Sequence, residues 1–529
     1  MSAERTPEDD ADVCVIGSGP GGALVAADLA ARGYSVVILE AGRWFDPDER
    51  HVQMELALRN GYDGLEVWEM GGERDEYLTL EYDVPLNTER VKGVGGTTLH
   101  WGAVTPRLHE EDFEMETRYG LARDWPLEYD DLRPYYAAAE RELGVSGDED
   151  NPFAPPRSEP YPMEGFPASQ ADSVYARGCE DVGVRMHTAP HAIASEPYDG
   201  RSPCQGYGTC IPVCPSGAKY SADVHVRKAE ADGARVIDRA QVHRLEHDST
   251  GETLERAHYT TPDGTEYEQA ADAFVVACGA IETPRLLLLS ASDAHPDGLA
   301  NSSGQVGRNL MGHPYVTTVA ALEERTRQNE IGFTTSISHE FYDHEEVPTS
   351  FQFEFSNVAE YAPMEIVSFT EEWGDDLFEP FDTHYGQVGS IVTAVEQLPD
   401  PDNRVTLAGS RTDNHGRPIP MVDWHLGERE LETAAFAQEV AADILTAIDG
   451  EVVWQSDPET VGMGAHHMGT TRMGTDPDES VVSPELRAHD LENLYISSAS
   501  TFVTGGAVNP TLTIAALALK VADHVDGRL

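Results

Sequence analysis

Three cysteines lie within eleven residues of one another. Cys204, Cys210 and Cys214 form the pattern C-x5-C-x3-C-P, and the glycines and prolines around them allow a loop to fold around an inorganic group. Thiolates bind zinc and iron–sulfur clusters, but three thiolates are one short of a closed zinc or four-iron site. The spacing leaves open a three-iron cluster, a zinc site completed by a histidine, and a loop of unliganded cysteines.

A glycine-rich turn near the N-terminus indicates a dinucleotide site. Gly17, Gly19 and Gly22 form G-S-G-P-G-G, in which missing side chains let backbone N–H groups approach a pyrophosphate at a helix N-terminus. Glu40 follows 23 residues after Gly17, near the spacing at which a carboxylate binds a ribose hydroxyl. The turn predicts a bound dinucleotide, and FAD and NAD both fit it.

The elements that must position this turn can be read from the apolar pattern. Residues 13–17 and 35–39 have the pattern of buried strands, and 22–32 between them has the pattern of a helix, which together make a βαβ unit. Further elements are expected at 273–277 (strand), 282–290 (helix) and 511–521 (helix). The stretches 111–217 and 316–457 are richer in proline, aromatics and alternating patterns, which predicts an inserted β-rich domain.

The charge of the chain is strongly negative. Its 529 residues contain 94 Asp plus Glu against 36 Lys plus Arg, a formal net charge of −58. Such a chain repels nucleic acid, and at low salt its charge would strain a compact fold. The carboxylates are spread among apolar residues instead of forming one tail, so we expect a folded, salt-adapted protein with an acidic surface.

Neither a signal peptide nor a membrane-spanning segment can be recognised in the sequence. The start lacks a charged-then-apolar pattern, and no stretch approaches the roughly 20 apolar residues of a span. The six cysteines are few for this length, which fits a reducing compartment. We therefore expect a cytoplasmic protein in which Cys14, Cys179 and Cys278 pack in the core.

A second glycine cluster carries a resemblance to a known family. The segment KGVGGTTLHWG contains Gly95, Gly96, Thr97 and Thr98, and it resembles the flavin-proximal segment of the glucose-methanol-choline (GMC) oxidoreductases. The stretches 278–290 and 304–314 also resemble this family, so the likeness spans nearly the whole chain. It implies FAD instead of NAD, and an α/β fold in which a Rossmann-type FAD-binding domain is interleaved with a β-rich substrate-binding domain.

Within the family the chain is most similar to the sugar and polyol dehydrogenases and to pyranose oxidase. In LHWGAVTPR, His100 takes the position at which pyranose oxidase attaches its flavin, whereas similar sugar dehydrogenases hold FAD without a covalent bond. Both states of His100 remain open. The resemblance also places Val242 beside the cofactor, and Ser498 where the family has an acidic residue near the pyrophosphate.

The same resemblance assigns the reacting pair. Oxidation of an alcohol by flavin needs a base for the O–H proton, and histidine titrates in the right range. In AHHMGTTRMG the catalytic histidine is His466, whereas His467 is expected to point elsewhere. Asn509 in GGAVNPTLT replaces a second histidine and would donate a hydrogen bond to the substrate oxygen. Its alternative role is to cap the helix that follows Pro510.

The resemblance implies domains, electron flow and partners. The FAD-binding domain would comprise 1–110, 218–315 and 458–529, and the substrate-binding domain 111–217 and 316–457, including the cysteine-rich loop 204–215. The cysteine spacing resembles the [3Fe-4S] loop of FAD glucose, fructose and sorbitol dehydrogenases. The chain would oxidise a sugar, polyol or sugar acid and pass electrons through the cluster to an external acceptor.

Partners and rival functions follow from the same likeness. A small accessory subunit that carries a signal, and a cytochrome, would be partners, so export in complex is an alternative to a cytoplasmic location. Rival functions are an oxygen-using oxidase of pyranose-oxidase type and a non-redox lyase of the same family. The particular sugar or polyol, the carbon attacked, the electron acceptor and the oligomeric state are not fixed by the sequence.

Overall fold

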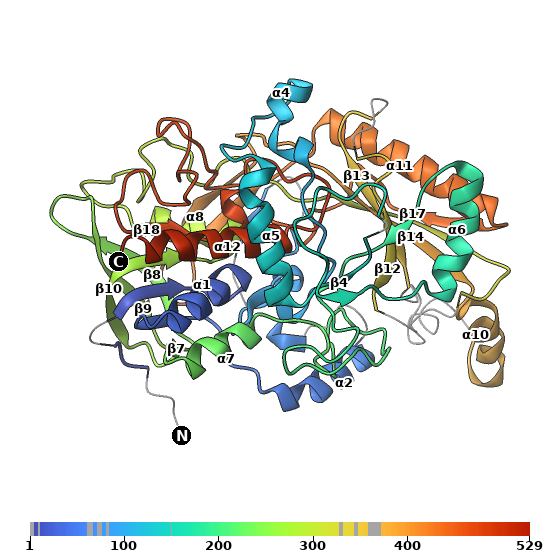
Figure 1. The fold of residues 1–529 in the computed structure, drawn as a ribbon, viewed down its shortest axis with the longest axis horizontal. Coiled ribbons are helices and arrows are strands. Elements are labelled where there is room, and N and C mark those ends of the chain that lie inside the picture. Colours follow the sequence, from blue (N-terminus) through green and yellow to red (C-terminus); the bar gives the residue numbers. More distant parts are fainter. Residues whose placement is uncertain are drawn as a thin grey trace.

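The computed structural model describes residues 5–8, 11–60, 67–70, 77–80, 84–149, 151–326, 332–342, 347–357 and 372–529. The chain forms two large sheets that lie at opposite ends of an elongated molecule, with helices over both (Figure 1). Both termini lie at the end that holds the N-terminal βαβ unit (Figure 1).

The first sheet has a parallel core built from the predicted βαβ unit. Its strand order is β7-β2-β1-β10-β9-β8, and β18 also pairs with β10. The core elements are β1 (Ala11–Ile16), α1 (Pro20–Ala31), β2 (Val36–Leu39), β7 (Arg235–Ile237), β10 (Glu266–Val276) and β18 (Leu494–Ile496). The predicted strands at 13–17, 35–39 and 273–277 are confirmed, apart from a residue or two at their ends.

Helix α1 is apolar around almost its whole circumference, with Asp28 as its one charged residue, and it is covered on most sides. It packs on β1 and β2, and it also contacts α7 (Asp223–Ala231) and α12 (Thr511–Asp526). A helix without a polar face belongs inside a fold. The helices expected at 22–32, 282–290 and 511–521 are present as α1, α8 (Gly279–Leu289) and α12.

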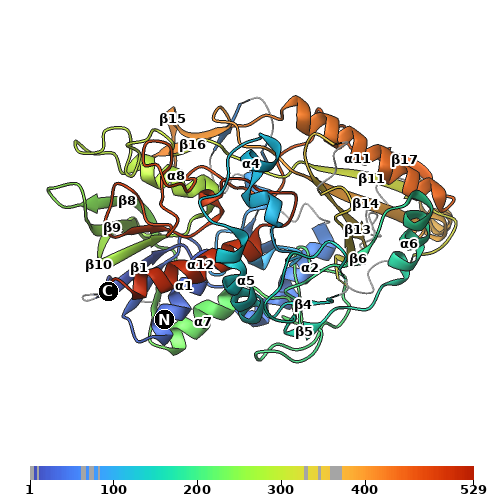
Figure 2. The ribbon, with the colours of Figure 1, turned by 45° about the horizontal axis from the view of Figure 1, so that its top comes forward.

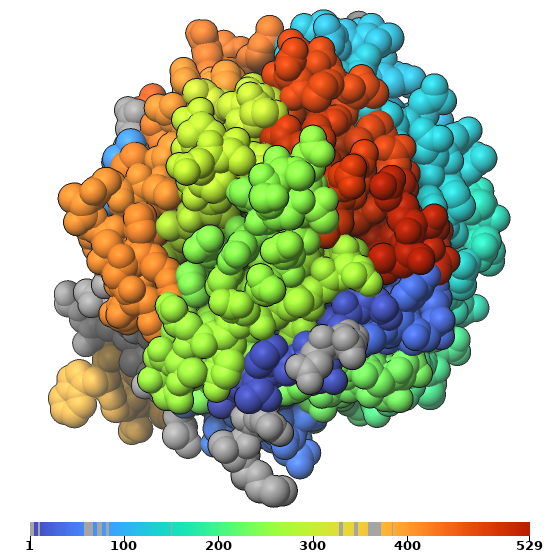
Figure 3. Space-filling model, turned by 90° about the vertical axis from the view of Figure 1, so that its left-hand side faces the viewer, coloured from blue at the N-terminus to red at the C-terminus, as the bar shows by residue number. Residues whose placement is uncertain are grey.

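Strand β10 pairs with parallel neighbours along one part of its length and with an antiparallel neighbour along the other. Residues 271–276 pair in parallel with β1 and β18, whereas 266–270 pair antiparallel with β9 (Leu254–Thr260), which continues to β8 (Gln241–His247). In Figure 3 this yellow-green region occupies the centre of one face, between the orange region of β15 and β16 and the red C-terminal region. Strand β8 thereby reaches the cofactor side of the sheet.

The second sheet is antiparallel and packs over a core cluster of its own. Its order is β17-β11-β14-β13-β12-β6, and α6 and α11 pack on it (Figure 2). The elements are β6 (His187–Thr188), β11 (Tyr315–Ala321), β12 (Thr334–Ser338), β13 (Phe351–Ser356), β14 (Val388–Val395), β17 (Glu451–Gln455), α6 (Gln170–Val182) and α11 (Glu428–Ala447). The stretch 316–457 is therefore β-rich, as predicted.

The stretch 111–217 is mainly helical where it is regular, and it departs from the β-rich expectation. It contains α4 (Met115–Tyr119), α5 (Tyr129–Leu143) and α6, with only the short strands β4 (Ser146–Gly147), β5 (Met163–Glu164) and β6. Most of its prolines lie in irregular loops, whereas Pro134 and several tyrosines lie in α5. The remaining elements are α2 (Arg50–Asn60), α3 (Leu86–Glu89), α10 (Phe378–His384) and a small sheet of β15 (Arg404–Thr412), β16 (Pro418–Asp423) and β3 (Leu78–Thr79).

Strand β13 is buried on both faces. Phe351, Phe353 and Phe355 form one face and join the core under α6 and α11. Successive strand residues point to opposite faces, so Gln352 and Glu354 lie on the other side, and both are buried. A strand of this composition must bring polar groups into the interior, where they need partners.

Candidate active site

A cavity of about 690 Å³ lies at the carboxyl edge of the parallel strands. Strands β1, β2, β10 and β18 end at this edge, so the residues that follow them meet there. Gly17, Glu40, Cys278 and Ser498 follow the four strands and line the cavity. This edge is where open α/β sheets bind their ligands.

The first glycine turn shows where a side chain is excluded and where space is left. A Cβ atom on Gly22 would lie 2.1 Å from the Gly17 carbonyl oxygen, so Gly22 allows α1 to pack close to β1. Gly19 has ordinary backbone angles, and a Cβ there would meet no protein atom within 4 Å. Gly17 and Gly19 line the cavity, whereas Gly22 does not. The open side of Gly19 fits a pyrophosphate at the N-terminus of α1.

Glu40 is held at the end of β2 by three hydrogen bonds. Its carboxylate accepts from the Ser18 N–H and hydroxyl at 3.0 and 2.6 Å, and from the Gly42 N–H at 2.8 Å. Burial raises the pKa of Glu40, and these donors oppose the rise. The carboxylate lines the cavity and keeps acceptor capacity for ribose hydroxyls.

The second glycine cluster packs face to face with the first. Gly95 and Gly96 adopt φ angles of 103° and 58°, which only glycine takes without strain. The Gly95 N–H donates to the Ser18 hydroxyl at 3.2 Å, and a Cβ on Gly96 would lie 2.9 Å from the Gly19 Cα atom. Gly96 lines the cavity and Gly95 lies behind it.

The two threonines that follow have different surroundings. The Thr98 hydroxyl donates to the Gly95 carbonyl at 2.6 Å and accepts from the Ala222 N–H at 2.8 Å, which connects this loop to α7. Thr97 lines the cavity and accepts from the Val91 N–H at 3.3 Å. Both side chains therefore stabilise the loop that forms the wall.

The remaining predicted cofactor contacts also line the cavity. His100, Val242 and Ser498 come from separate segments and meet there. Burial, helped by the charge of Lys219, lowers the pKa of His100 to about 4, so its imidazole is neutral at physiological pH. The Ser498 hydroxyl contacts Ser500 at 2.7 Å and caps a short 3₁₀ turn.

At the other end of the cavity, the hydrogen bonds of His466 set its tautomer. His313 Nε2 lies 2.8 Å from the Gly506 carbonyl, which can only accept, so Nε2 carries the proton and Nδ1 is an acceptor. His466 Nδ1 lies 2.9 Å from His313 Nδ1 and must donate to it. The Nε2 atom of His466 is then unprotonated and available as a base. Burial, with His313 and His467 nearby, lowers the pKa of His466 well below its usual value.

Asn509 does not cap the helix that follows it. Helix α12 begins at Thr511 without a side-chain cap. The Asn509 Oδ1 atom instead accepts from Gln352 Nε2 at 3.2 Å, and its Nδ2 donates to Glu354 Oε1 at 3.2 Å. Gln352 also donates to Glu354 at 3.0 Å. This triangle uses one Nδ2 proton of Asn509 and leaves the second unbonded to the triangle, and Asn509 lines the cavity.

Two expectations about neighbouring residues are corrected. His467 lines the same cavity as His466, and its Nε2 has no hydrogen-bond partner among the described residues. Both imidazoles therefore reach the cavity, and they differ in their hydrogen bonds. Cys14 and Cys179 are in the core as expected, but Cys278 lines the cavity and its thiol donates to the Ile16 carbonyl at 3.2 Å. Cys278 lies two residues after the end of β10, in the turn that faces the cavity.

Several cavity residues escape sequence reasoning. Glu354 and Glu89 are lining carboxyls, Tyr315 lies 3.1 Å from His466 Nδ1 through its hydroxyl, and His313 holds His466. His313 lies within the 304–314 segment that resembles the family, which was a usable signal. The F-Q-F-E-F-S alternation of β13 predicts a half-exposed strand, and the sequence contains no sign that its polar face turns toward a site.

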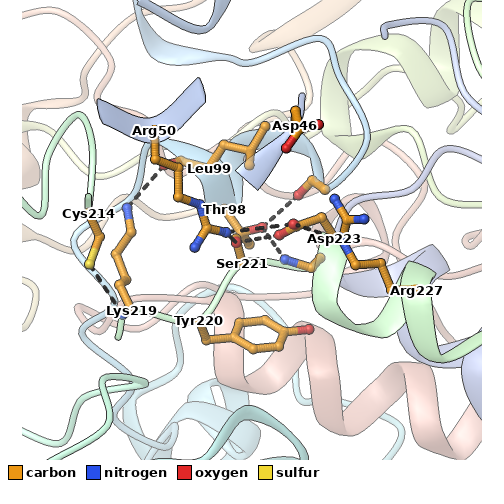
Figure 4. Close-up of polar contacts among 12 residues, drawn as sticks. Asp46, Arg50, Thr98, Leu99, Cys214, Lys219, Tyr220, Ser221, Asp223 and Arg227 are labelled. Carbon is orange, nitrogen blue, oxygen red and sulfur yellow. Dashed lines mark hydrogen bonds and ion pairs between the residues drawn. The ribbon is translucent and has the colours of Figure 1, made fainter. Parts of the chain in front are cut away.

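The three cysteines lie near the cavity but not in its wall. Ile211, which follows Cys210, lines the cavity, and buried Lys219 donates to the carbonyls of Leu99, Trp101 and Cys210 at 3.1, 2.7 and 2.7 Å. Figure 4 shows Lys219 between the Leu99 carbonyl and Cys214. The loop is thus fastened to the segment that contains His100.

The thiols interact with one another. Burial raises the pKa of Cys210 to about 12, and Cys214 and Cys204 add to the rise. Burial also acts on Cys214, but the Lys219 N–H and ammonium bring the pKa of that thiol below its usual value. Within the described ranges no three His, Cys, Asp or Glu side chains are arranged to hold a metal ion, and this holds for the three cysteines of the loop as well as for a zinc site with a histidine ligand.

The two glycine turns, the Glu40 carboxylate and the His466 imidazole thus meet at one cavity on the carboxyl edge of a Rossmann-type sheet, the arrangement of a dinucleotide-dependent oxidoreductase. Two family models match the chain, both described as GMC oxidoreductase, over residues 83–315 and 399–518. The chain belongs to the GMC oxidoreductase family, and it is an FAD-dependent oxidoreductase that acts on CH–OH groups of alcohol- or sugar-type substrates.

Two relatives cover nearly the whole chain. It is 34% identical to the fructose dehydrogenase large subunit of Gluconobacter japonicus, over 97% of each chain. It is 32% identical to the 2-methyl-1,2-propanediol dehydrogenase of Mycolicibacterium austroafricanum, over 99% of this chain and 96% of the relative. The fold matches the crystal structure of formate oxidase with a TM-score of 0.71 at 16% identity, over 99% of each chain.

Proposed function

We propose that the protein is a dehydrogenase that oxidises a hydroxyl of a sugar, polyol or sugar acid to a carbonyl. The observation that carries this proposal is the tautomer of His466, whose Nε2 atom is left as a free acceptor in the cavity that Asn509 also lines. The relatives named as fructose and 2-methyl-1,2-propanediol dehydrogenases support this substrate class.

The residues of the chain divide the work of the reaction. The His466 Nε2 atom accepts the hydroxyl proton of the substrate as the C–H bond breaks. The free N–H of Asn509 donates to the same oxygen and stabilises the charge that develops there. FAD, when bound, accepts the hydride. Gln352 and Glu354 hold the Asn509 amide in the orientation that presents N–H, not C=O, to the substrate.

FAD would be held at the carboxyl edge of the parallel sheet. We assign the pyrophosphate to the turn of Gly17 and Gly19, the ribose to Glu40, and further contacts to Gly96, Thr97, His100, Val242 and Ser498, with Gly22, Gly95 and Thr98 supporting the turns from behind. The neutral imidazole of His100 suits either a covalent bond to the flavin or packing against it. Intact mass after denaturation distinguishes these states.

We further propose that Cys204, Cys210 and Cys214 bind a [3Fe-4S] cluster. The support is the mutual influence of the three thiols, the N–H donors at 3.4 and 3.5 Å from the sulfurs of Cys204 and Cys214, and the contact of their loop with the cavity through Ile211. Such a cluster transfers single electrons. The external acceptor would then be a cytochrome or another redox partner, and a small accessory subunit fits the same picture.

The proposal extends to the domain bounds and the location of the protein. We assign the FAD-binding domain to 1–110, 218–315 and 458–529, and the substrate-binding domain to 111–217 and 316–457. Within the described residues, no helix is long and apolar enough to cross a membrane. We propose a cytoplasmic location, or export in complex with a signal-bearing subunit.

We also propose that the surface is acidic and adapted to salt, because the net charge is −58. Screening by salt should relieve the repulsion among the carboxylates. The temperature of unfolding should therefore rise steeply between dilute buffer and molar KCl. A flat response would remove the salt-adaptation proposal without touching the enzymatic one.

The test is anaerobic purification at high salt, followed by absorption and low-temperature EPR spectra before and after addition of candidate sugars and polyols. Bleaching of the flavin together with loss of an oxidised three-iron signal is the expected result. A bleached flavin without iron, with peroxide released in air, would point to an oxidase. A flavin that no hydroxyl compound bleaches would overturn the dehydrogenase proposal and favour a non-redox lyase.

A further inference from the structure

The charged residues that line the cavity are mostly paired. Arg90 pairs with Glu282 at 3.5 Å, and Arg285 pairs with Glu282 and Asp413 at 3.1 and 2.8 Å. Arg417 pairs with Glu266 at 3.3 Å, and the charge of Lys92 acts on Glu40. Burial keeps the lining histidines neutral, since it lowers the pKa of each one. They are His100, His243, His466 and His467.

Two lining carboxyls are left over from this pairing. Among the described residues, Glu354 is hydrogen-bonded only to the neutral amides of Gln352 and Asn509, and Glu89 has no side-chain hydrogen bond or ion pair. Glu354 is buried without a cation and Glu89 is half-buried without one, which costs free energy unless a ligand supplies donors. A protein keeps such unpaired carboxyls where they contribute to its function.

Both carboxyls belong to the reacting end of the cavity. Burial raises the pKa of Tyr315, and the charges of Glu354 and Glu89 add to the rise, so both act on one phenol. The hydroxyl of Tyr315 lies 3.1 Å from His466 Nδ1, and Glu354 accepts from Asn509. Glu354 therefore contacts the pair that handles the substrate hydroxyl, and the charge of Glu89, which lines the same cavity, acts on Tyr315 beside that pair.

We propose that Glu89 and Glu354 form an acceptor pair that selects the charge of the substrate. A carboxylate accepts hydrogen bonds from hydroxyl and ammonium groups, and it repels another carboxylate. The site then takes neutral polyols and sugars, takes cationic amino polyols at least as well, and rejects sugar acids. This inference rests on the proposed function and narrows its substrate class. Burial raises the pKa of each carboxyl to about 7, so both are largely ionised at pH 8.

Three six-carbon compounds that differ only at one end test the idea. Glucitol, 1-amino-1-deoxyglucitol and gluconate are neutral, cationic and anionic at pH 8. Their dissociation constants are measured anaerobically, from the perturbation of the oxidised flavin spectrum and from stopped-flow flavin reduction. Wild type should bind gluconate about tenfold or more weaker than glucitol, the factor that a modest charge repulsion gives. The amino compound should bind at least as tightly as glucitol.

Glu89→Gln is the informative variant because Glu89 has no structural hydrogen bond to lose. It should reduce the discrimination between glucitol and gluconate severalfold. Glu354→Gln should do the same with a slower flavin reduction, since a neutral amide oxygen is a weaker acceptor for the Asn509 N–H than a carboxylate. Glu439→Gln on the exposed face of α11 removes the same charge elsewhere and should change nothing. Equal binding of gluconate and glucitol in wild type, or unchanged discrimination in Glu89→Gln, would overturn the inference.

The two proposals fail in different ways. If none of the compounds bleaches the flavin, the proposed dehydrogenase function fails for this substrate class, whereas spectral perturbation still ranks their binding by charge. If all three bleach the flavin with equal affinity, the dehydrogenase function stands and the acceptor pair does not.

Discussion

The two ends of the cavity are built by different means. The cofactor end is made of backbone: Gly17 and Gly19, which follow β1, and Gly96, in the loop after α3, bring the main chain to the cavity wall. The reacting end is made of side chains from four separate segments, held by hydrogen bonds that span more than 150 residues in sequence. A cofactor common to many enzymes can be bound by a local motif, whereas a particular reaction needs convergence of distant residues.

This difference predicts the largest effect for alanine at Gly22, with Gly19 as its matched partner. The Gly22 Cβ would lie 2.1 Å from a carbonyl oxygen, so Gly22→Ala must displace α1. This overpacking should lower the free energy of unfolding of the apoprotein by about 1–3 kcal/mol or more, and its unfolding temperature should fall. Gly19→Ala should leave the apoprotein stable, because its methyl group enters the empty cavity. It should weaken FAD binding roughly tenfold to a hundredfold.

Thermal unfolding of the two apoproteins and FAD titration separate these effects. Gly409→Ala, where the new Cβ meets no atom within 4 Å and lies outside the cavity, is the control. If Gly19→Ala retains FAD with wild-type affinity, the pyrophosphate does not lie on this turn.

At the reacting end, the largest loss is expected from His466→Asn. Removing the base should slow anaerobic flavin reduction by about 10²–10⁴-fold, with FAD content unchanged. His467→Asn is the adjacent control and should cost less than about tenfold by the same scale. If the His467 variant is the slower of the two, the base has been assigned to the wrong imidazole.

Asn509→Ala should come next. Losing one preorganised donor to a developing oxyanion costs about 10²–10³-fold in rate in comparable sites. The loss should appear in the limiting rate of flavin reduction and much less in the substrate dissociation constant. A variant that weakens binding but reduces flavin at the wild-type rate would show that Asn509 holds only the ground state.

The contrast between the two ends also explains what the sequence could predict. The strand, turn and helix around Gly17, Gly19 and Glu40 are local, so their periodicity and spacing contain the answer. His466 and Asn509 were predicted only through resemblance to the family, because no pattern within the chain connects residues that far apart. Glu354 and Glu89 were missed. A buried polar face on β13 has the same alternation as a solvated one, and a carboxyl on a short helix such as α3 is normally solvated.

The smallest predicted effect concerns His313, which acts on the substrate only through His466. His313→Leu removes the acceptor of the His466 Nδ1 proton. One hydrogen bond contributes about 1 kcal/mol, so the rate should fall by roughly tenfold or less. The Tyr315 hydroxyl, 3.1 Å from the same nitrogen, can still accept from it, which limits the loss. His313→Gln keeps an amide oxygen as acceptor and should restore most of the rate.

The pH profile separates this positioning role from a structural one. The base works unprotonated, so the rate of flavin reduction rises with pH through the pKa of His466, which burial holds below 6.5. His313 and His467 lower that pKa further, so both His313 variants should move the acidic limb to higher pH, toward the ordinary histidine value. Burial raises the pKa of Glu89 and of Glu354 to about 7, so both carboxyls also contribute to the pH profile. Repeating the profile with Glu89→Gln added reduces this contribution. An unmoved limb together with an equal rate loss in the Leu and Gln variants would mean that His313 only fills space, and that the tautomer of His466 is set by Tyr315 instead.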